Sequence, residues 1–188
     1  MRIVGGALKG RNIIAPSGVA VRPTTDRVRE AIFNMLAHGS ALPRGIDNAR
    51  VLDLFAGTGA LGLEALSRGA AYALFVDNAV QARGALRGNI EALALTGRTR
   101  VFRRNAIKLG DLPANAGLPF NIIFLDPPYE KGLGPKALAA ARTGGWLAAK
   151  ATIIFELSAR EDDPEAQRFE LIDVRTYGDS KVAYLRGP

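Results

Sequence analysis

Short apolar runs alternate with amphipathic stretches over most of this chain, from about residue 50 onward. Five runs have the length and composition of strands, namely 51–55, 72–76, 100–103, 121–125 and 151–156. Apolar residues at helical spacing predict helices from about residue 60, over about 79–95 and over about 135–142. Because the strands are almost continuously apolar, we expect an α/β fold in which helices cover both faces of a parallel sheet.

The pattern changes near the C-terminus. Residues 169–176 and 182–186 flank the turn sequence Gly178-Asp179-Ser180 and predict a hairpin. The hairpin implies an antiparallel strand at the end of an otherwise parallel sheet. If the first of its strands runs parallel to the core strands, the turn lies at the carboxyl edge of the sheet. Lys181, just after the turn, then lies at the same edge.

Residues 1–49 precede the alternating pattern, and we interpret them as a basic extension packed on a core domain of residues 50–188. Segments 2–4 and 12–14 predict the short strands of a small β-hairpin around a Gly-rich turn. Thr24 or Thr25 is a candidate cap for a helix that continues to about Ala37.

Composition narrows the chemistry. The chain has 188 residues, and 48% of them are hydrophobic, which suffices for one compact domain. It has no cysteine and a single histidine, His38, so thiolate nucleophiles, Cys-ligated zinc and multi-His metal centres are not expected. No apolar run is long enough for a membrane span and the first residues lack the apolar core of a signal peptide, so we expect a cytoplasmic protein.

The net charge of +7 is concentrated at the start of the chain, where residues 1–50 carry eight basic and three acidic side chains. Such an excess suggests a polyanionic partner, because each Lys or Arg set against a phosphate releases counterions. A solvated, arginine-rich surface would give the same composition, so the charge alone leaves both interpretations open.

Residues 53–62 have the sequence Asp-Leu-Phe-Ala-Gly-Thr-Gly-Ala-Leu-Gly. This sequence predicts a strand that ends in an acid and continues through a Gly-rich turn into a helix. The glycines also match the dinucleotide pattern G-x-G-x-x-G. An acid at Asp53 would repel a diphosphate, whereas it suits a ligand that carries ammonium and sulfonium groups. Asp53 therefore favours S-adenosylmethionine over a nicotinamide cofactor.

Three further positions follow strands that end at the same edge. Asp77 ends the second core strand, where its carboxylate could accept hydrogen bonds from two ribose hydroxyls; capping of the next helix is the alternative role. Asn105 and Ala106 follow the third core strand and could present an amide and a backbone N–H to an adenine edge.

The sequence Asp126-Pro127-Pro128-Tyr129 follows the fourth core strand. An exocyclic base amine is a poor nucleophile because its lone pair is delocalised into the ring. If the Asp126 carboxylate and the Pro127 carbonyl each accept one N–H, the nitrogen pyramidalises and its lone pair is aimed at the methyl group. Tyr129 offers a face on which a flipped or single-stranded base can stack. A Pro-rich turn with Tyr129 covering the core is the structural alternative.

Further segments are distinctive: Arg-Ile-Val-Gly-Gly at 2–6, Gly-Arg at 10–11, Arg-Pro-Thr-Thr-Asp-Arg-Val-Arg-Glu-Ala-Ile-Phe-Asn at 22–34, and Tyr-Gly-Asp-Ser-Lys at 177–181. With them the chain resembles, nearly end to end, the RsmD-type 16S ribosomal RNA guanine-N2 methyltransferases of bacteria. The resemblance implies a class I, Rossmann-like methyltransferase fold with a mostly parallel seven-stranded sheet. It also implies S-adenosylmethionine as donor and methylation of guanine 966 of 16S RNA within a partly assembled small ribosomal subunit.

Carried over by motif, the resemblance also implies a role for each site residue. The cofactor would be held by Asp53, Phe55, Gly57, Thr58, Gly59, Asp77, Asn105 and Ala106. The target base would be held by Asp126, Pro127 and Tyr129. Arg11, Arg22 and Arg27 of the basic extension are candidate RNA contacts, as is Lys181 from the position of its turn; packing and a surface ion pair are the alternative role for Arg22 and Arg27. No metal is implied.

Three alternatives remain to be weighed. A DNA adenine-N6 methyltransferase, or another nucleic-acid amino-methyltransferase, would share both core motifs. The DNA enzyme generally needs added segments to read base edges, for which this chain has little length. A nicotinamide enzyme accounts for the glycines but not for Asp53 or residues 126–129. A non-catalytic RNA-binding module accounts only for the basic extension.

Overall fold

The computed structural model describes residues 1–15, 25–38, 45–129, 131–164 and 169–187. Its longer helices and strands are α1 (Asp26–His38), β1 (Arg50–Leu54), α2 (Ala60–Ser67), β2 (Tyr72–Asp77), α3 (Val80–Ala92), β3 (Thr99–Arg103), β4 (Phe120–Leu125), α4 (Leu133–Thr143), β5 (Leu147–Ser158), β6 (Glu170–Tyr177) and β7 (Ser180–Arg186). Short 3-10 turns are η1 (Thr96–Arg98), η2 (Ala106–Lys108) and η3 (Ala114–Ala116). Among the described helices, none is long and apolar enough to cross a membrane.

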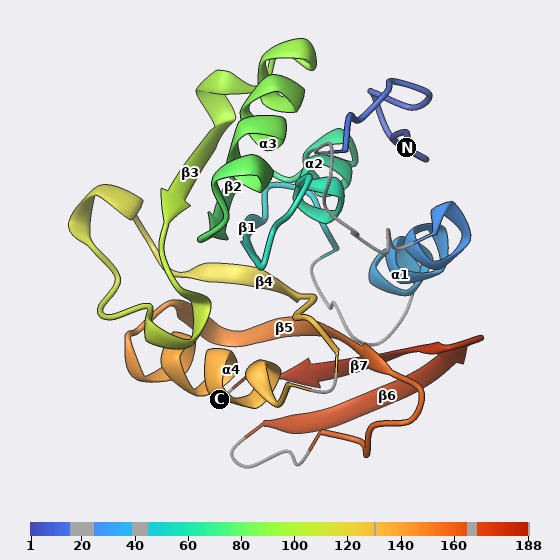
Figure 1. Ribbon diagram of the computed structural model, residues 1–188, viewed down its shortest axis with the longest axis vertical. Coiled ribbons are helices and arrows are strands. Elements are labelled where there is room, and N and C mark those ends of the chain that lie inside the picture. Colours follow the sequence, from blue (N-terminus) through green and yellow to red (C-terminus); the bar gives the residue numbers. More distant parts are fainter. Residues whose placement is uncertain (16–24, 39–44, 130, 165–168, 188) are drawn as a thin grey trace.

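One seven-stranded sheet organises the chain in the order β3-β2-β1-β4-β5-β7-β6 (Figure 1). Strands β1 to β5 pair in parallel, and β7 pairs antiparallel with both β5 and β6. The prediction of a parallel sheet with an antiparallel C-terminal strand is therefore confirmed. In space, β7 lies between β5 and β6, so that β6 forms one edge of the sheet.

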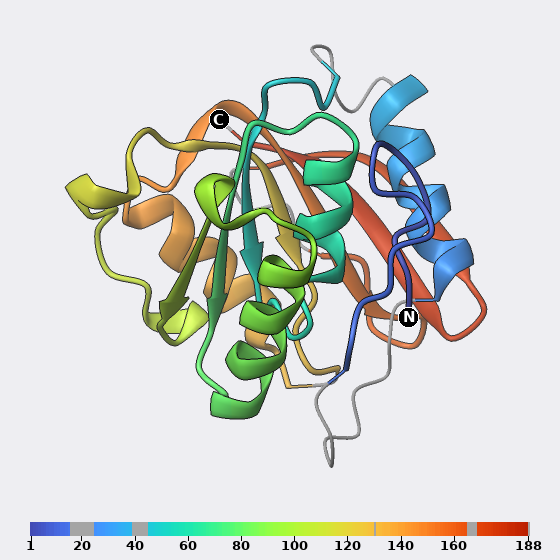
Figure 2. The same cartoon turned by 90° about the horizontal axis from the view of Figure 1, so that it is seen from above.

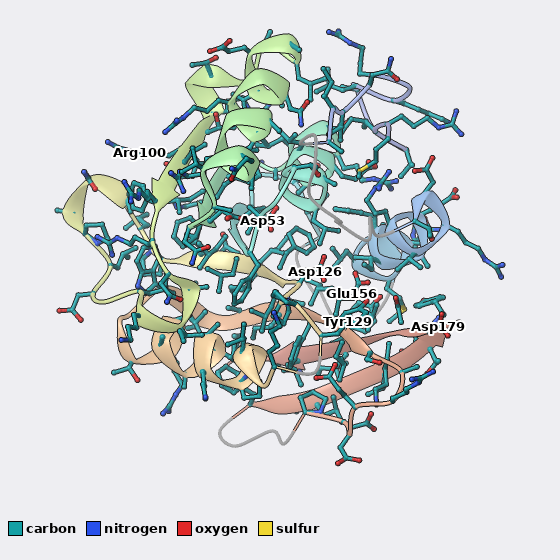
Figure 3. All side chains as sticks on the ribbon, viewed as in Figure 1. Asp53, Arg100, Asp126, Tyr129, Glu156 and Asp179 are labelled. Atoms are coloured by element: carbon teal, nitrogen blue, oxygen red, sulfur yellow. The ribbon has the colours of Figure 1, made fainter. Side chains whose placement is uncertain are left out.

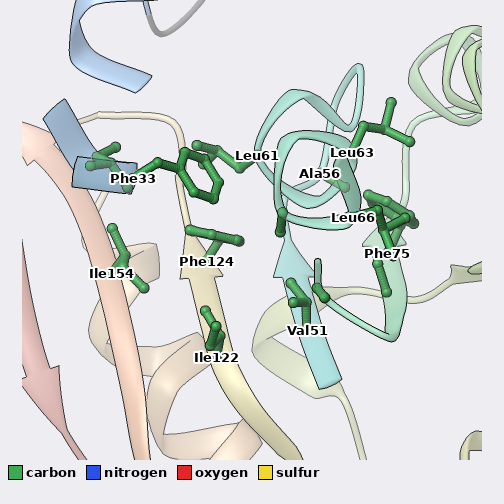
Figure 4. Close-up of a cluster of buried hydrophobic side chains, with 14 of the residues drawn as sticks. Phe33, Val51, Ala56, Leu61, Leu63, Leu66, Phe75, Ile122, Phe124 and Ile154 are labelled. Carbon is green, nitrogen blue, oxygen red and sulfur yellow. The ribbon is translucent and has the colours of Figure 1, made fainter. Parts of the chain in front are cut away.

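Helices cover both faces of the sheet, as the continuously apolar strands predicted. Helices α1, α2 and α3 pack on one face, where Phe33, Leu61 and Leu86 belong to the same buried cluster as Phe124 of β4 (Figures 2 and 4). Helix α4 packs on the other face with the fully buried Trp146. Burial of one large apolar side chain contributes about 2 kcal/mol, so these two clusters hold the helices against the sheet.

Residues 1–15 lie against α2 and α3. The predicted hairpin is short: Arg2 and Asn12 form an isolated antiparallel bridge. The backbone N–H of Val4 donates to the fully buried Glu64 carboxylate at 2.7 Å, and that of Leu8 donates to Ser67 Oγ at 2.9 Å. These buried polar contacts fix the segment on the core because a buried carboxylate left without its donors would be costly.

Helix α1 begins where the sequence predicted. Thr25 Oγ1 accepts a hydrogen bond from the N–H of Val28 at 3.3 Å, which is the expected cap, while Thr24 is outside the described residues. Arg29 is fully buried and donates to the Asp26 carboxylate and the Arg2 carbonyl, each at 2.7 Å. A side chain of the basic run thus joins α1 to the N-terminal segment.

Two element boundaries differ by three or more residues from the sequence expectation. Helix α3 ends at Ala92 rather than near residue 95, because Ala94 has a φ of 56° and turns the chain out of the helix. Strand β5 begins at Leu147, ahead of the predicted residue 151. A register irregularity in its pairing with β4 between Phe120 and Ile122, together with a φ of 56° at Lys150, interrupts the apolar pattern there.

Candidate active site

The Gly-rich turn after β1 leaves the sheet through backbone conformations that favour glycine. Gly57 has a φ of 54° and Gly59 a φ of 79°. A Cβ on Gly59 would lie 2.3 Å from Leu86 Cδ1, whereas a Cβ on Gly57 would meet only the Phe55 carbonyl oxygen, at 3.9 Å. Gly59 is therefore required by packing. The space beside Gly57 is open and lets a ligand approach the backbone closely.

Phe55 is the non-glycine residue of this turn with a left-handed backbone, with a φ of 59°. Such a conformation costs roughly 1–2 kcal/mol and persists where the surroundings enforce it. The neighbouring Thr58 is buried, and its carbonyl accepts a hydrogen bond from Asn89 Nδ2 at 3.0 Å. Asn89 also bonds both backbone groups of Ile14, so the N-terminal segment braces the turn.

Asp53 is 2% exposed, and its Oδ2 accepts a hydrogen bond from the N–H of Gly62 at 2.9 Å. Burial raises the pKa of this carboxyl to about 8; the Gly62 N–H opposes the shift and the charge of Asp77 adds to it. The carboxyl is thus predominantly protonated at neutral pH. A cation placed beside it would favour the ionised form and lower the pKa again.

Asp77 joins the turns that follow β1 and β2. Its Oδ2 accepts from the N–H of Gly57 at 2.9 Å, and its Oδ1 accepts from the N–H of Ala79 at 2.8 Å. The second bond supports the start of α3, which was the alternative role considered for this residue. Each carboxylate oxygen can accept a further bond, so these contacts leave acceptor capacity for hydroxyl groups.

Asn105 and Ala106 lie past the end of β3, on the same edge of the sheet. Asn105 is exposed, and its Oδ1 accepts from the N–H of Ile107 at 3.1 Å, which caps η2. Ala106 is 4% exposed, so it can offer a ligand a backbone group but little side-chain surface. The pair thus lies where the sequence placed it.

Residues 126–129 leave the end of β4 beside the Gly-rich turn, since β4 pairs with β1 along Asp53 and Leu54. Asp126 is half-buried and Pro127 is buried. The Tyr129 hydroxyl donates to Glu156 Oε1 at 2.8 Å and lies 3.0 Å from Ser180 Oγ. Figure 3 shows Asp126, Tyr129 and Glu156 together at this end of the sheet.

The environment of Tyr129 keeps its phenol protonated. Burial raises the pKa of the hydroxyl, and the negative charge of Glu156 raises it further. Tyr129 is therefore a neutral group with a fixed orientation. Glu156, 4% exposed, and Ser180, 8% exposed, were missed by the sequence reasoning. An acid inside the apolar run 151–157 was the signal that could have identified Glu156.

The four candidate RNA contacts have different surroundings. Arg11 and Arg27 are exposed, and the Arg11 guanidinium donates to the Ala92 carbonyl at 2.6 Å. Arg22 lies outside the described residues. Lys181 is only 8% exposed, and its Nζ donates to the Glu161 carbonyl at 2.5 Å and to the Asp163 carboxylate at 2.7 Å.

The turn before Lys181 does lie at the carboxyl edge, because Ser180 pairs with Ser158 at the end of β5. The geometric expectation for the turn is thus met. The ammonium group of Lys181, however, is engaged within the protein and fastens the segment that follows β5. Its placement does not favour a direct contact with RNA.

The sheet order, the antiparallel β7 and the Gly-rich turn after β1 define a class I methyltransferase fold. The Escherichia coli protein yhhF, classed as a candidate methyltransferase, matches with a TM-score of 0.84 and 37% identity over 100% of this chain and 97% of its own. The Haemophilus influenzae protein HI0767, classed as a candidate methylase, matches with a TM-score of 0.79 and 26% identity, over 100% of this chain and 98% of its own.

The family model described as Conserved hypothetical protein 95 matches residues 1–186, and this chain belongs to that family. Ribosomal RNA small subunit methyltransferase D of Escherichia coli K12 is 43% identical over 156 residues, which are 83% of this chain and 74% of the relative. Its Haemophilus influenzae counterpart is 30% identical over 179 residues, 95% of this chain and 89% of the relative. The predicted resemblance is confirmed.

Proposed function

We propose that this protein is an S-adenosylmethionine-dependent methyltransferase that methylates the exocyclic N2 of a guanine in 16S ribosomal RNA, namely guanine 966. The observation that carries the proposal is the position of Asp126 and Pro127. They follow the strand next to β1, so an amine acceptor lies beside a turn suited to a cationic cofactor. The names of the relatives support ribosomal RNA as the polymer.

The residues of the turn fit S-adenosylmethionine. The open space at Gly57 admits a ligand to the backbone, and buried Asp53 offers a carboxyl that a cationic group would ionise. Asp77 would hold the ribose hydroxyls, with Asn105 and Ala106 at the adenine. Phe55, Thr58 and Gly59 shape the turn between them. When bound, the cofactor supplies a methyl group attached to a positively charged sulfur.

The target amine would be held by Asp126 and Pro127. The Asp126 carboxylate and the Pro127 carbonyl each accept one N–H of the amine, which localises the nitrogen lone pair and directs it along the line of transfer. The methylated nitrogen then carries an extra proton and a positive charge. Asp126 receives that proton, and no general base is needed before transfer because the amine becomes acidic only afterwards.

Tyr129 would form the stacking surface for the target base. Its ring is held by the hydroxyl contacts to Glu156 and Ser180, so little orientational freedom remains to be lost when a base binds. We assign Glu156 and Ser180 as positioning residues. They act on the base through Tyr129.

RNA would reach this edge across the N-terminal segment and α1, which carry exposed arginines. The exposed Arg11 and Arg27 lie on the N-terminal segment and on α1. Each phosphate contact made by such a side chain adds affinity that declines with salt. We include Arg22 on the basis of the resemblance and set Lys181 aside for the contacts described above. The substrate would be the small ribosomal subunit or one of its assembly intermediates.

The substrate is tested by offering the protein several polymers. The protein is incubated with methyl-labelled S-adenosylmethionine and, separately, free 16S RNA, small-subunit particles or duplex DNA, and label in each polymer is counted. The proposal expects label in RNA, whether free or within particles. Label in duplex DNA alone would instead support a DNA adenine-N6 methyltransferase.

A further inference from the structure

A groove of about 840 Å³ runs between α1 and the edge strand β6. Arg27, Asn34 and His38 line it from the helix, and Asp173, Arg175 and Tyr177 line it from the strand. The volume lies within the range of about 300–1,000 Å³ that is typical of ligand clefts. The cofactor turn and residues 126–129 contribute nothing to its lining, so it is separate from the site described above.

The chemistry of the groove suits a nucleic-acid backbone. Arg27 and Arg175 are exposed guanidinium groups, and Arg175 Nε lies 2.9 Å from the Asp173 carboxylate. The side chains of this ion pair are 50% and 34% exposed, so the pair is weak and leaves the remaining guanidinium donors accessible. Guanidinium groups are well matched to phosphate oxygens, and Asn34 and Tyr177 can bond or stack on exposed bases.

The groove also leads to the target-base site. Tyr177, at its carboxyl-edge end, pairs with Ser180, whose hydroxyl lies 3.0 Å from that of Tyr129. Arg27 lies in the first turn of α1. Figure 2 shows that this turn and the C-terminal end of β1 lie at the same end of the molecule. A strand in the groove would thus continue toward Tyr129.

We propose that this groove binds the single-stranded RNA segment next to the methylated nucleotide, with Arg27 and Arg175 on successive phosphates. The inference rests on the proposed function, which supplies the RNA. A peptide partner is less well matched, because the described lining carries two guanidinium groups and one carboxylate and has only a few apolar side chains, among them Met35 and Ile172. The groove is therefore expected to recognise the phosphate backbone and the flexibility of a single RNA strand, and not the identity of particular bases.

The test removes the charge of both groove cations and keeps two of the three methylenes in each stem, in the double variant Arg27→Gln/Arg175→Gln. Binding of a labelled, mixed-sequence single-stranded oligoribonucleotide is followed by anisotropy from low to high salt. The loss of two phosphate contacts should make the negative slope of log affinity against log salt shallower by about 1.4. It should weaken binding about 25-fold at 0.1 M salt. Calorimetry should give an unchanged affinity for S-adenosylmethionine.

Arg87→Gln is the matched control, because Arg87 is an exposed arginine of α3 that lies outside the groove. It should leave the oligonucleotide affinity within about twofold and the salt slope within about 0.3, less than half the value of about 0.7 for one single-strand phosphate contact. An identical response of the double variant and the control would overturn the proposal.

A protein partner predicts another pattern. Turnover on assembled small-subunit particles would then fall in the double variant, while affinity for the oligoribonucleotide stayed at the wild-type value, and this outcome also overturns the proposal. Because binding is measured without methyl transfer, the groove and the proposed function fail separately. A wild type that methylates no RNA contradicts the function, even if groove binding is intact.

Discussion

The two sides of the candidate site are built differently. On the cofactor side, Asp53 bonds Gly62 nine residues away and Asp77 bonds Gly57 twenty residues away. On the base side, Tyr129 is held by Glu156 and Ser180, 27 and 51 residues away. The carboxylates of the cofactor turn therefore bond within β1, β2 and the segments that follow them, and Asn89 of α3 is the more distant brace of that turn. The base site depends on the pairing of β4, β5 and β7, so changes on the two sides should have separable effects.

The largest expected effect separates chemistry from cofactor binding. Asp126→Ala removes the carboxylate that accepts the amine N–H and the released proton, and we expect kcat to fall by about a thousandfold. Calorimetry should give the wild-type affinity for S-adenosylmethionine, because Asp126 lies on the base side. A parallel loss of cofactor affinity would show that the two sides are not separable and would contradict the role assigned to Asp126.

Gly59→Ala tests whether the cofactor turn is fixed by packing. The added Cβ would lie 2.3 Å from Leu86 Cδ1 at a φ of 79°. We expect the free energy of unfolding to fall by about 2–4 kcal/mol, from overpacking and a strained backbone. Gly84→Ala is the matched control, since Gly84 is exposed within α3 and a Cβ added there would meet no atom within 4 Å. It should stabilise by about 0.5–1 kcal/mol, as denaturant titration would measure.

Asp53 gives the cofactor side a pH dependence. Its pKa of about 8 in the folded protein exceeds the ordinary value of 3.8, so its contribution to stability is full below about pH 4 and is lost as pH rises toward 8. Because a cationic ligand requires the ionised form, affinity for S-adenosylmethionine should rise roughly tenfold per pH unit between about pH 5.5 and 7, with proton release on binding.

Calorimetry in buffers of different ionisation enthalpy measures that proton release. Asp53→Asn keeps an oxygen acceptor for Gly62 and removes the titration, so its cofactor affinity should be lower and nearly independent of pH. It should also lack the loss of stability between about pH 4 and 8. A wild-type affinity that is flat over this range would mean that Asp53 is not the group that meets the cation.

The smallest expected effect concerns Tyr129. Tyr129→Phe keeps the stacking ring but loses the contacts to Glu156 and Ser180, which are worth about 1–1.4 kcal/mol together, so kcat/KM for RNA should fall about five- to tenfold. Glu156→Gln retains an oxygen acceptor for the phenol, so its kcat/KM for RNA should fall less. Steady-state kinetics on RNA measures both. Equal activity of all three proteins would remove the positioning role of Glu156.

Sequence alone predicted the sheet, its antiparallel final strand and the edge on which Asp53, Asp77 and Asp126 gather. These features follow from apolar periodicity and from residues at the ends of parallel strands. It did not predict Glu156, Ser180 or Asn89, because their roles depend on which distant strand or helix lies alongside. For Lys181 it placed the turn correctly, but it could not foresee that Glu161 and Asp163 engage the ammonium group.

The central claim concerns the atom that is methylated, and nucleoside analysis tests it most directly. RNA from small-subunit particles treated with the protein and methyl-labelled S-adenosylmethionine is digested, and the labelled nucleoside is identified by mass spectrometry against synthetic standards. The account predicts N2-methylguanosine with wild-type protein and almost none with Asp126→Ala. Label on a ring nitrogen or carbon, or on the N6 of adenine in place of guanine, would contradict it.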